Sequence, residues 1–190
     1  YMIEDRFLRK VILNKIKKET NISHLTSKVV QKQRVEGGLI EITLNGGIIL
    51  KGDIAIGADG FPSRSAGRAK VRNFGWTYNQ SSIVGVVRHE NSHENEAIQF
   101  FLPAGPLAIL PLTDNRSCYV WTMGTKEAKF IYELDDEKFL KKLIEVFNNC
   151  RGNLVLDTKK SVFPISLALG RNLVKERFAL IGDSAHNIHP

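Results

Sequence analysis

The sequence has little cysteine and no long apolar run. Only two of its 190 residues are cysteines, Cys118 and Cys150, too few for a disulfide framework or a zinc site built from thiolates. No stretch approaches the roughly 20 consecutive apolar residues of a membrane-spanning helix, and no charged-then-apolar leader opens the chain. We therefore expect neither a disulfide-stapled secreted domain nor an integral membrane protein, and a cytoplasmic setting is the default.

The charge is positive but not concentrated. The 27 lysines and arginines exceed the 20 acidic residues, for a formal net charge of +7, yet they are scattered along the chain. Nucleic-acid-binding proteins gather such charge into one patch or stripe, so we expect a solvated basic surface and no nucleic-acid partner. Weak attraction to anionic lipid is a second interpretation. With 43% hydrophobic residues, the chain can build a sizeable core.

The apolar spacing in the first third of the chain predicts a helix followed by short strands. Residues 3–18 have the period of an amphipathic helix, and we expect it to pack against a sheet. Residues 29–35, 39–44 and 48–50 alternate like strands, separated by glycine pairs that suit tight turns. Residues 53–56 then form a short apolar strand.

The rest of the chain is richer in strands. The pattern predicts strands over 82–88, 97–102, 107–112, 117–123 and 178–181, and a helix over 136–149. We therefore predict an α/β (α+β) fold in three segments. Residues 1–73 and 166–190 form parts of a Rossmann-like domain, and 74–165 form an inserted β-rich domain.

Two short apolar strands end in a glycine turn with an aspartate. The first ends in Gly57-Ala58-Asp59-Gly60, where missing side chains would let a ligand approach the backbone and Asp59 would accept hydrogen bonds from ligand hydroxyls. A plain Asp-Gly turn is the alternative. If both strands lie in one sheet, both aspartates reach the same edge, where α/β sheets bind ligands.

The second turn, Gly182-Asp183-Ser184-Ala185-His186, is more specific. It predicts a ribose hydroxyl held by Asp183 and a helix beginning there, its N-terminus aimed at an electron-rich group. A serine esterase that uses Gly-Asp-Ser is an alternative, but that motif opens its domain. His186 and His189 could share a metal, but no third ligand is near in sequence, so we expect no metal site.

The two turns together, with a β-rich insert between them, resemble the internal FAD motifs of single-component flavoprotein hydroxylases. The segments 76–80 and 99–112, and the helix entry at 2–6, resemble the ubiquinone-pathway hydroxylases in particular. The resemblance spans nearly the whole chain. It implies FAD contacts at Arg6, Gly57, Asp59, Gly60, Gly182, Asp183, Ala185, His186 and Pro190.

The chain also departs from the family pattern. Ala66 stands where an arginine usually follows the motif serine, and Ser184 stands where alanine is commoner, a change we expect to cost little. The chain has no Gly-x-Gly-x-x-Gly. We therefore expect the chain to be an internal piece of the enzyme and inactive alone.

The function implied by the resemblance is a monooxygenase. FAD, NAD(P)H and O₂ would hydroxylate a hydrophobic, polyprenylated phenol in ubiquinone biosynthesis, with Phe100, Phe101, Leu107, Ile109 and Trp121 as one wall of the ring pocket. No side chain is predicted to act as a nucleophile. Alternatives are a flavin hydroxylase of another aromatic or isoprenoid substrate and a non-catalytic FAD-fold protein. Peripheral contact with the inner membrane or with a ubiquinone-pathway complex is a further expectation.

Overall fold

A computed structural model describes residues 2–188, which fall into two compact units. One unit contains residues 2–18 and 79–165, and the other contains 19–78 and 166–188. The three-segment division expected above stays a prediction. The compact units differ from it at residues 2–18, which group with 79–165, and at residues 74–78, which group with the unit of the two turns.

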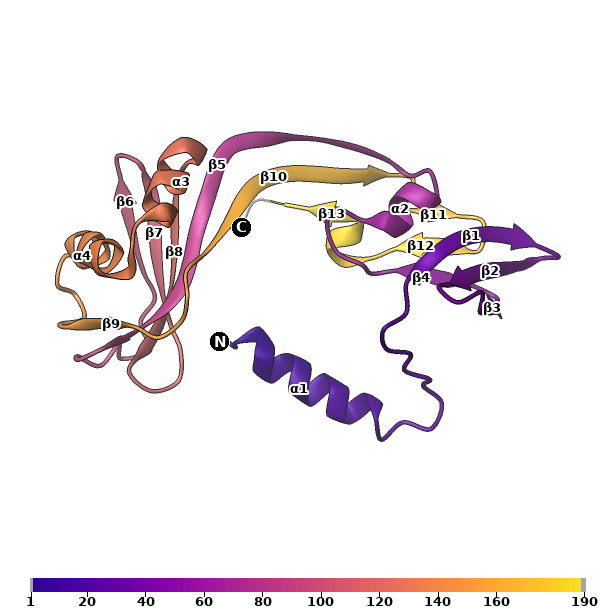
Figure 1. Ribbon diagram of the computed structural model, residues 1–190, viewed down its shortest axis with the longest axis horizontal. Coiled ribbons are helices and arrows are strands. Elements are labelled where there is room, and N and C mark those ends of the chain that lie inside the picture. Colours follow the sequence, from indigo (N-terminus) through magenta and orange to yellow (C-terminus); the bar gives the residue numbers. More distant parts are fainter. Residues whose placement is uncertain (1, 189–190) are drawn as a thin grey trace. The chain divides into compact units, whose positions relative to one another are not determined.

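The second unit holds both aspartate turns. Its first sheet is the antiparallel meander β1 (Val30–Glu36), β2 (Leu39–Leu44) and β3 (Ile49–Gly52), as the glycine pairs predict. A second sheet has the order β11 (Val174–Lys175), β12 (Phe178–Leu180), β4 (Ala55–Gly57), and β12 and β4 run parallel. Figure 1 shows the short helix α2 (Arg64–Arg68) beside these strands.

A small apolar core joins the elements of this unit. It brings together residues from β2, α2, β12 and the second turn, namely Ile40, Ala66, Val71, Phe178, Leu180 and Ala185. Each of these side chains is less than a tenth exposed. The packing fixes both turns on one scaffold even though more than 100 residues separate them in sequence.

The first unit is a sheet covered by two helices. Its strands are the part of β5 (Arg72–His89) from residue 79 on, β6 (Ile98–Leu102), β7 (Gly105–Pro111), β8 (Arg116–Gly124) and β9 (Leu154–Leu156). The order is β5-β8-β7-β6, with β9 paired to the other side of β5. Helices α3 (Thr125–Glu133) and α4 (Asp136–Phe147) pack on it through the core residues Ala128, Ile131, Phe139, Leu143 and Phe147 (Figure 1).

Helix α4 follows directly from its sequence. The Asp135 side chain accepts the backbone N–H of Lys138 at 2.9 Å and caps the first turn. Phe139, Leu143 and Phe147 recur every four residues and are fully buried. Asn148, in the left-handed conformation with φ 48°, ends the helix.

Helix α1 (Asp5–Ile16) forms as predicted, but its apolar side is not packed against a sheet. No α1 residue is buried, and Phe7, Val11 and Ile12 are each at least 45% exposed among the described residues. The residue before the helix, Glu4, forms a two-point ion pair with Arg116 at 2.9 and 3.1 Å.

Arg116 is the centre of a charged chain in this unit. It also donates to Asp157 at 2.8 Å, and Asp157 accepts from Arg88 at 2.7 Å. The Arg116 side chain is only 6% exposed. The hydrogen bonds that Arg116 donates to Glu4 and Asp157 outweigh burial and raise the pKa of Arg116, so the buried cation is fully paired.

Several elements differ from the sequence predictions, and helices α2 and α3 and strand β9 were not predicted. Strand β5 begins ten residues earlier than expected, and β10 (Ser161–Arg171) was not predicted. Within the described residues, 182–188 form the 3-10 turn η1 (Gly182–Ser184) and the strand β13 (His186–Asn187), which pairs with β10, rather than the expected helix start. Backbone pairing to β10 at Ala168 and Leu169 therefore replaces the predicted helix N-terminus.

Among residues 2–188, no helix has the length and apolar character to cross a membrane.

Candidate functional site

The two aspartate turns lie side by side at the ends of parallel strands. Leu180 pairs with Gly57, and the backbone N–H of Ile181 donates to the Gly57 carbonyl oxygen at 3.0 Å. Beyond this bond the two strands end and both chains turn. Carboxyl ends of neighbouring parallel strands are where α/β sheets bind ligands, so the predicted juxtaposition of Asp59 and Asp183 is present.

Gly57 is required where β4 passes under α2. A Cβ there would lie 2.4 Å from Ser65 Oγ, 2.7 Å from Leu180 Cδ2 and 3.0 Å from Phe178 Cζ. The glycine is buried and allows close packing of the strand, and its predicted contact with FAD stays a prediction.

The Asp59 carboxylate accepts hydrogen bonds from other residues of the chain. Oδ1 accepts from Ser65 Oγ at 2.6 Å, Ser63 Oγ at 2.7 Å and Ser184 Oγ at 3.1 Å, and Oδ2 accepts the Ser65 backbone N–H at 2.9 Å. Burial acts to raise the pKa of Asp59, but the hydrogen bonds from Ser65 and Ser63 outweigh it and hold the pKa well below its ordinary value. The ionised carboxylate therefore organises the loop, and the predicted contact of Asp59 with FAD stays a prediction.

Ser184 connects the two turns, a role that the sequence did not reveal. Its Oγ accepts the Gly60 backbone N–H at 2.8 Å and lies 3.1 Å from Asp59 Oδ1. The serine was expected to be a small change from alanine. No pattern in the sequence points to a partner 124 residues away.

The outer face of the two turns is open to a ligand. Gly60 and Gly182 have φ values of +74° and +59°, and a Cβ at either position would meet no atom within 4 Å. Asp183 is exposed, and no other described residue forms a hydrogen bond or ion pair with its carboxylate. Open backbone at two glycines beside a free hydroxyl acceptor fits the ribityl or ribose part of FAD.

The remaining predicted residues are placed differently. Ala185 is 4% exposed and belongs to the small core, so it supports the turn from below. The His186 side chain is exposed on β13. Arg6 belongs to the other unit, where it pairs with Glu4 at 2.9 Å. Pro190 lies outside the described residues, and FAD contacts at Arg6, His186 and Pro190 stay predictions.

The expected wall of the ring pocket is mostly core. Leu107 and Ile109 are fully buried and Trp121 is 5% exposed, within the core of the first unit. They do not line an open pocket. Phe101 alone among the five is largely exposed, at 84%.

Two cavities lie in the unit that carries the turns. The first, of about 320 Å³, begins at Phe61, next to Gly60, and is lined by Asn73, Gly75, Trp76, Thr77, Ser166, Leu167 and Ala168. The second, of about 380 Å³, lies near the start of β12 and is lined by residues that include Arg34, Arg68, Lys70 and Lys175.

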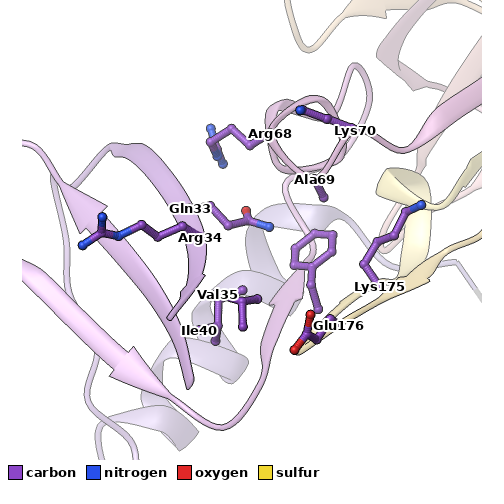
Figure 2. Close-up of a pocket in the computed structure, with 10 residues that line it drawn as sticks. Gln33, Arg34, Val35, Ile40, Arg68, Ala69, Lys70, Lys175 and Glu176 are labelled. Carbon is purple, nitrogen blue, oxygen red and sulfur yellow. The ribbon is translucent and has the colours of Figure 1, made fainter. Parts of the chain in front are cut away.

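The positively charged groups that line the second cavity do not converge on one position. Figure 2 shows the charged ends of Arg34 and Lys175 pointing in opposite directions. Arg34 is also paired with Glu41 at 3.0 Å. Separated and partly neutralised cations favour a solvated surface over an anion site.

No family model matches the chain, but its sequence is similar to that of several known proteins. It is 33% identical over its whole length to ubiquinone hydroxylase UbiL of Rhodospirillum rubrum. It is 32% identical over 80% of its length to the mitochondrial ubiquinone biosynthesis monooxygenase COQ6 of Mus musculus. The chain spans 44% and 39% of these two relatives, so less than half of either.

The fold also matches solved structures. The structure of PqsL from Pseudomonas aeruginosa in complex with 2-aminobenzoylacetate superposes with a TM-score of 0.80 at 20% identity, over 96% of this chain and 52% of that one. A likeness at this identity concerns the fold. It agrees with the predicted α/β fold with an FAD-binding part and a sheet domain. The chain is therefore similar in sequence to part of the ubiquinone hydroxylases and similar in fold to PqsL.

Proposed function

We propose that this chain is part of an FAD-dependent monooxygenase that hydroxylates a polyprenylated phenol on the way to ubiquinone, with NAD(P)H and O₂ as co-substrates. The observation that carries the proposal is the pair of aspartate turns at the carboxyl ends of β4 and β12, with open glycine backbone and a free Asp183 carboxylate. The named activities of the relatives support the same reaction class.

The residues of this chain would bind and orient the cofactor. Asp183 would accept hydrogen bonds from flavin-chain hydroxyls, and the backbone at Gly60 and Gly182 would admit the cofactor at close range. Asp59 would act indirectly, because its hydrogen bonds to Ser65 hold the loop that carries Gly60 in place. When bound, FAD would supply the oxygen-activating chemistry, which needs no nucleophilic side chain from the protein.

The substrate class is supported by relatives and by the apolar cavity beside Phe61. The cavity wall combines Phe61 and Trp76, which are 44% and 49% exposed, with the small residues Gly75 and Ala168. Aromatic walls of this kind suit a flat apolar ring. A flavin hydroxylase of another aromatic or isoprenoid substrate is the second candidate, because the same wall would accept such rings.

The test is NAD(P)H oxidation by the complete protein with different phenols. Prenylated phenols should stimulate oxidation and yield the hydroxylated ring, whereas small polar benzoates should stimulate it little. Stimulation by benzoates alone would contradict the substrate assignment, and no flavin-dependent oxidation with any phenol would contradict the reaction class.

The setting follows from the proposed substrate. We propose a cytoplasmic location with peripheral contact to the inner membrane, or to other enzymes of the pathway, because a polyprenylated phenol partitions into lipid. The net charge of +7 favours contact with anionic headgroups. Co-sedimentation of the complete protein with anionic and with neutral vesicles tests the membrane contact. Binding to anionic vesicles alone would show that headgroup charge is responsible.

A further inference from the structure

Ser184 extends the contact between the two turns beyond the end of the sheet. The last ladder bond between the strands is Ile181 N–H to the Gly57 carbonyl oxygen, at 3.0 Å. Three residues farther along each chain, the Ser184 hydroxyl accepts the Gly60 N–H at 2.8 Å. A side chain thus replaces the backbone bond that the diverging strands no longer make.

The Ser184 hydroxyl has partners both as a hydrogen-bond acceptor and as a donor. Its oxygen accepts from Gly60, and its one hydrogen is directed to Asp59 Oδ1 at 3.1 Å or to the Gly60 carbonyl oxygen at 3.3 Å. Ser184 is only 4% exposed, so water does not easily take its place. Alanine at this position would leave the Gly60 N–H without its acceptor.

The contact reaches the helix behind the first turn. Asp59 accepts from Ser65 at the start of α2 through both the side chain and the backbone. Ser63 caps α2, because its Oγ accepts the Ala66 N–H at 3.0 Å, and it also donates to Asp59. Ser184 is therefore the one side chain of the second turn that joins this network among the described residues.

We propose that Ser184 is a positioning residue for the cofactor: its hydroxyl sets the separation of the Gly60 and Gly182 turns that would hold FAD. The proposal rests on the proposed function, since it concerns where the cofactor is held. Asp183 and Gly182 precede Ser184 in the same 3-10 turn, so a shift of Ser184 moves the hydroxyl acceptor relative to Gly60.

The test compares two buried serines in the complete protein. Ser184→Ala removes the bridging hydroxyl. Ser82→Ala is the matched control, because Ser82 is 5% exposed and bonds to Thr122 at 2.7 Å in the other unit. For each protein, FAD is titrated into the apoprotein, the visible circular dichroism of the flavin is recorded at saturating FAD, and urea unfolding of the apoprotein is measured.

The Ser184→Ala protein should bind FAD about 10-fold more weakly, the scale of one unsatisfied buried donor, with a changed flavin dichroism. The Ser82→Ala protein should lose comparable stability but keep the wild-type Kd and spectrum. Equal Kd and spectrum for Ser184→Ala and wild type would overturn the positioning role alone. Wild-type protein that binds no FAD would overturn the proposed function and this role with it.

A second measurement does not depend on the variant folding. In the wild-type apoprotein, the Gly60 amide should exchange its hydrogen more slowly than a free loop amide, because the buried Ser184 accepts it in a partly buried hydrogen bond. Exchange as fast as that of an unprotected loop amide would show that the contact does not persist in solution, and would overturn the proposal.

Discussion

Asp59 and Ser65 are joined twice, once through the serine hydroxyl at 2.6 Å and once through its backbone N–H at 2.9 Å. The pair closes the first turn onto the start of α2. An ionised carboxylate is the best acceptor for this set of donors, because it has two oxygens and no hydrogen of its own. The charge of Asp59 should therefore matter more for stability than for direct ligand contact.

Asp59→Asn should lower the free energy of unfolding by about 2 kcal/mol at pH 7, since charged acceptors make the stronger hydrogen bonds and the NH₂ group that replaces one carboxylate oxygen cannot accept from the hydroxyl or N–H donors around it. The loss should stay constant from pH 7 down to about pH 5 and shrink as the pH falls below about 4. The folded-state pKa of Asp59 is lowered, so its contribution is present above its unfolded pKa of about 3.9 and disappears as the pH falls toward the folded value.

Urea unfolding of both proteins across this pH range measures the effect. A stability difference that is independent of pH would mean that the carboxylate charge is not what the hydroxyls bind.

Gly57→Ala should destabilise the protein by about 1–3 kcal/mol, because the added methyl group overlaps Ser65, Leu180 and Phe178 in a packed region. Gly67→Ala is the matched control within α2. A Cβ at Gly67 meets no atom within 4 Å, so alanine there should be neutral or stabilising by up to about 1 kcal/mol. Denaturant midpoints distinguish the two, and equal midpoints would contradict the tight packing of β4 under α2.

Arg116→Met should destabilise the protein by about 3 kcal/mol at neutral pH, because it leaves Glu4 and Asp157 without their buried cation. Arg88→Met removes the other partner of Asp157, but Arg88 is 61% exposed, so its cost should stay below about 1 kcal/mol.

The effect of Arg116 should also depend on pH. Its hydrogen bond lowers the pKa of Glu4, and with Arg88 it outweighs the burial that would raise the pKa of Asp157. Both carboxylates contribute stability above about pH 4 that is lost on acidification, so the Arg116→Met difference should narrow near pH 3. Thermal unfolding at pH 7 and pH 3 checks this, and a larger loss at pH 3 would be inconsistent with the ion pairs.

The sequence predicted elements whose apolar pattern is long and regular. Helix α4 carries its cap at Asp135 and three buried residues four apart, so its start was predicted correctly. The meander β1–β3 was predicted from its glycine pairs. Helix α3 was missed because only Ala128 and Ile131 are buried and no side chain caps it. Strand β10 was missed because Pro164 lacks the N–H of a strand interior.

The candidate site was predictable in its position but not in its contacts. The glycine turns after apolar strands correctly placed Asp59 and Asp183 at one sheet edge. Nothing local shows that Ser184 contacts Asp59 and Gly60, because these bonds depend on the register of β4 and β12. That register is set by packing across more than 100 residues.

The central claim is that Asp183 binds the cofactor, and FAD titration of the complete apoprotein tests it most directly. Asp183→Ala should weaken FAD binding by at least about 10-fold, the scale of a lost charged hydrogen bond, and Asp183→Asn should bind with intermediate affinity because it keeps one acceptor oxygen. Because Asp183 is exposed and unpaired among the described residues, both variants should unfold at the wild-type denaturant midpoint. An Asp183→Ala protein that purifies fully yellow, with wild-type flavin affinity, would contradict the account.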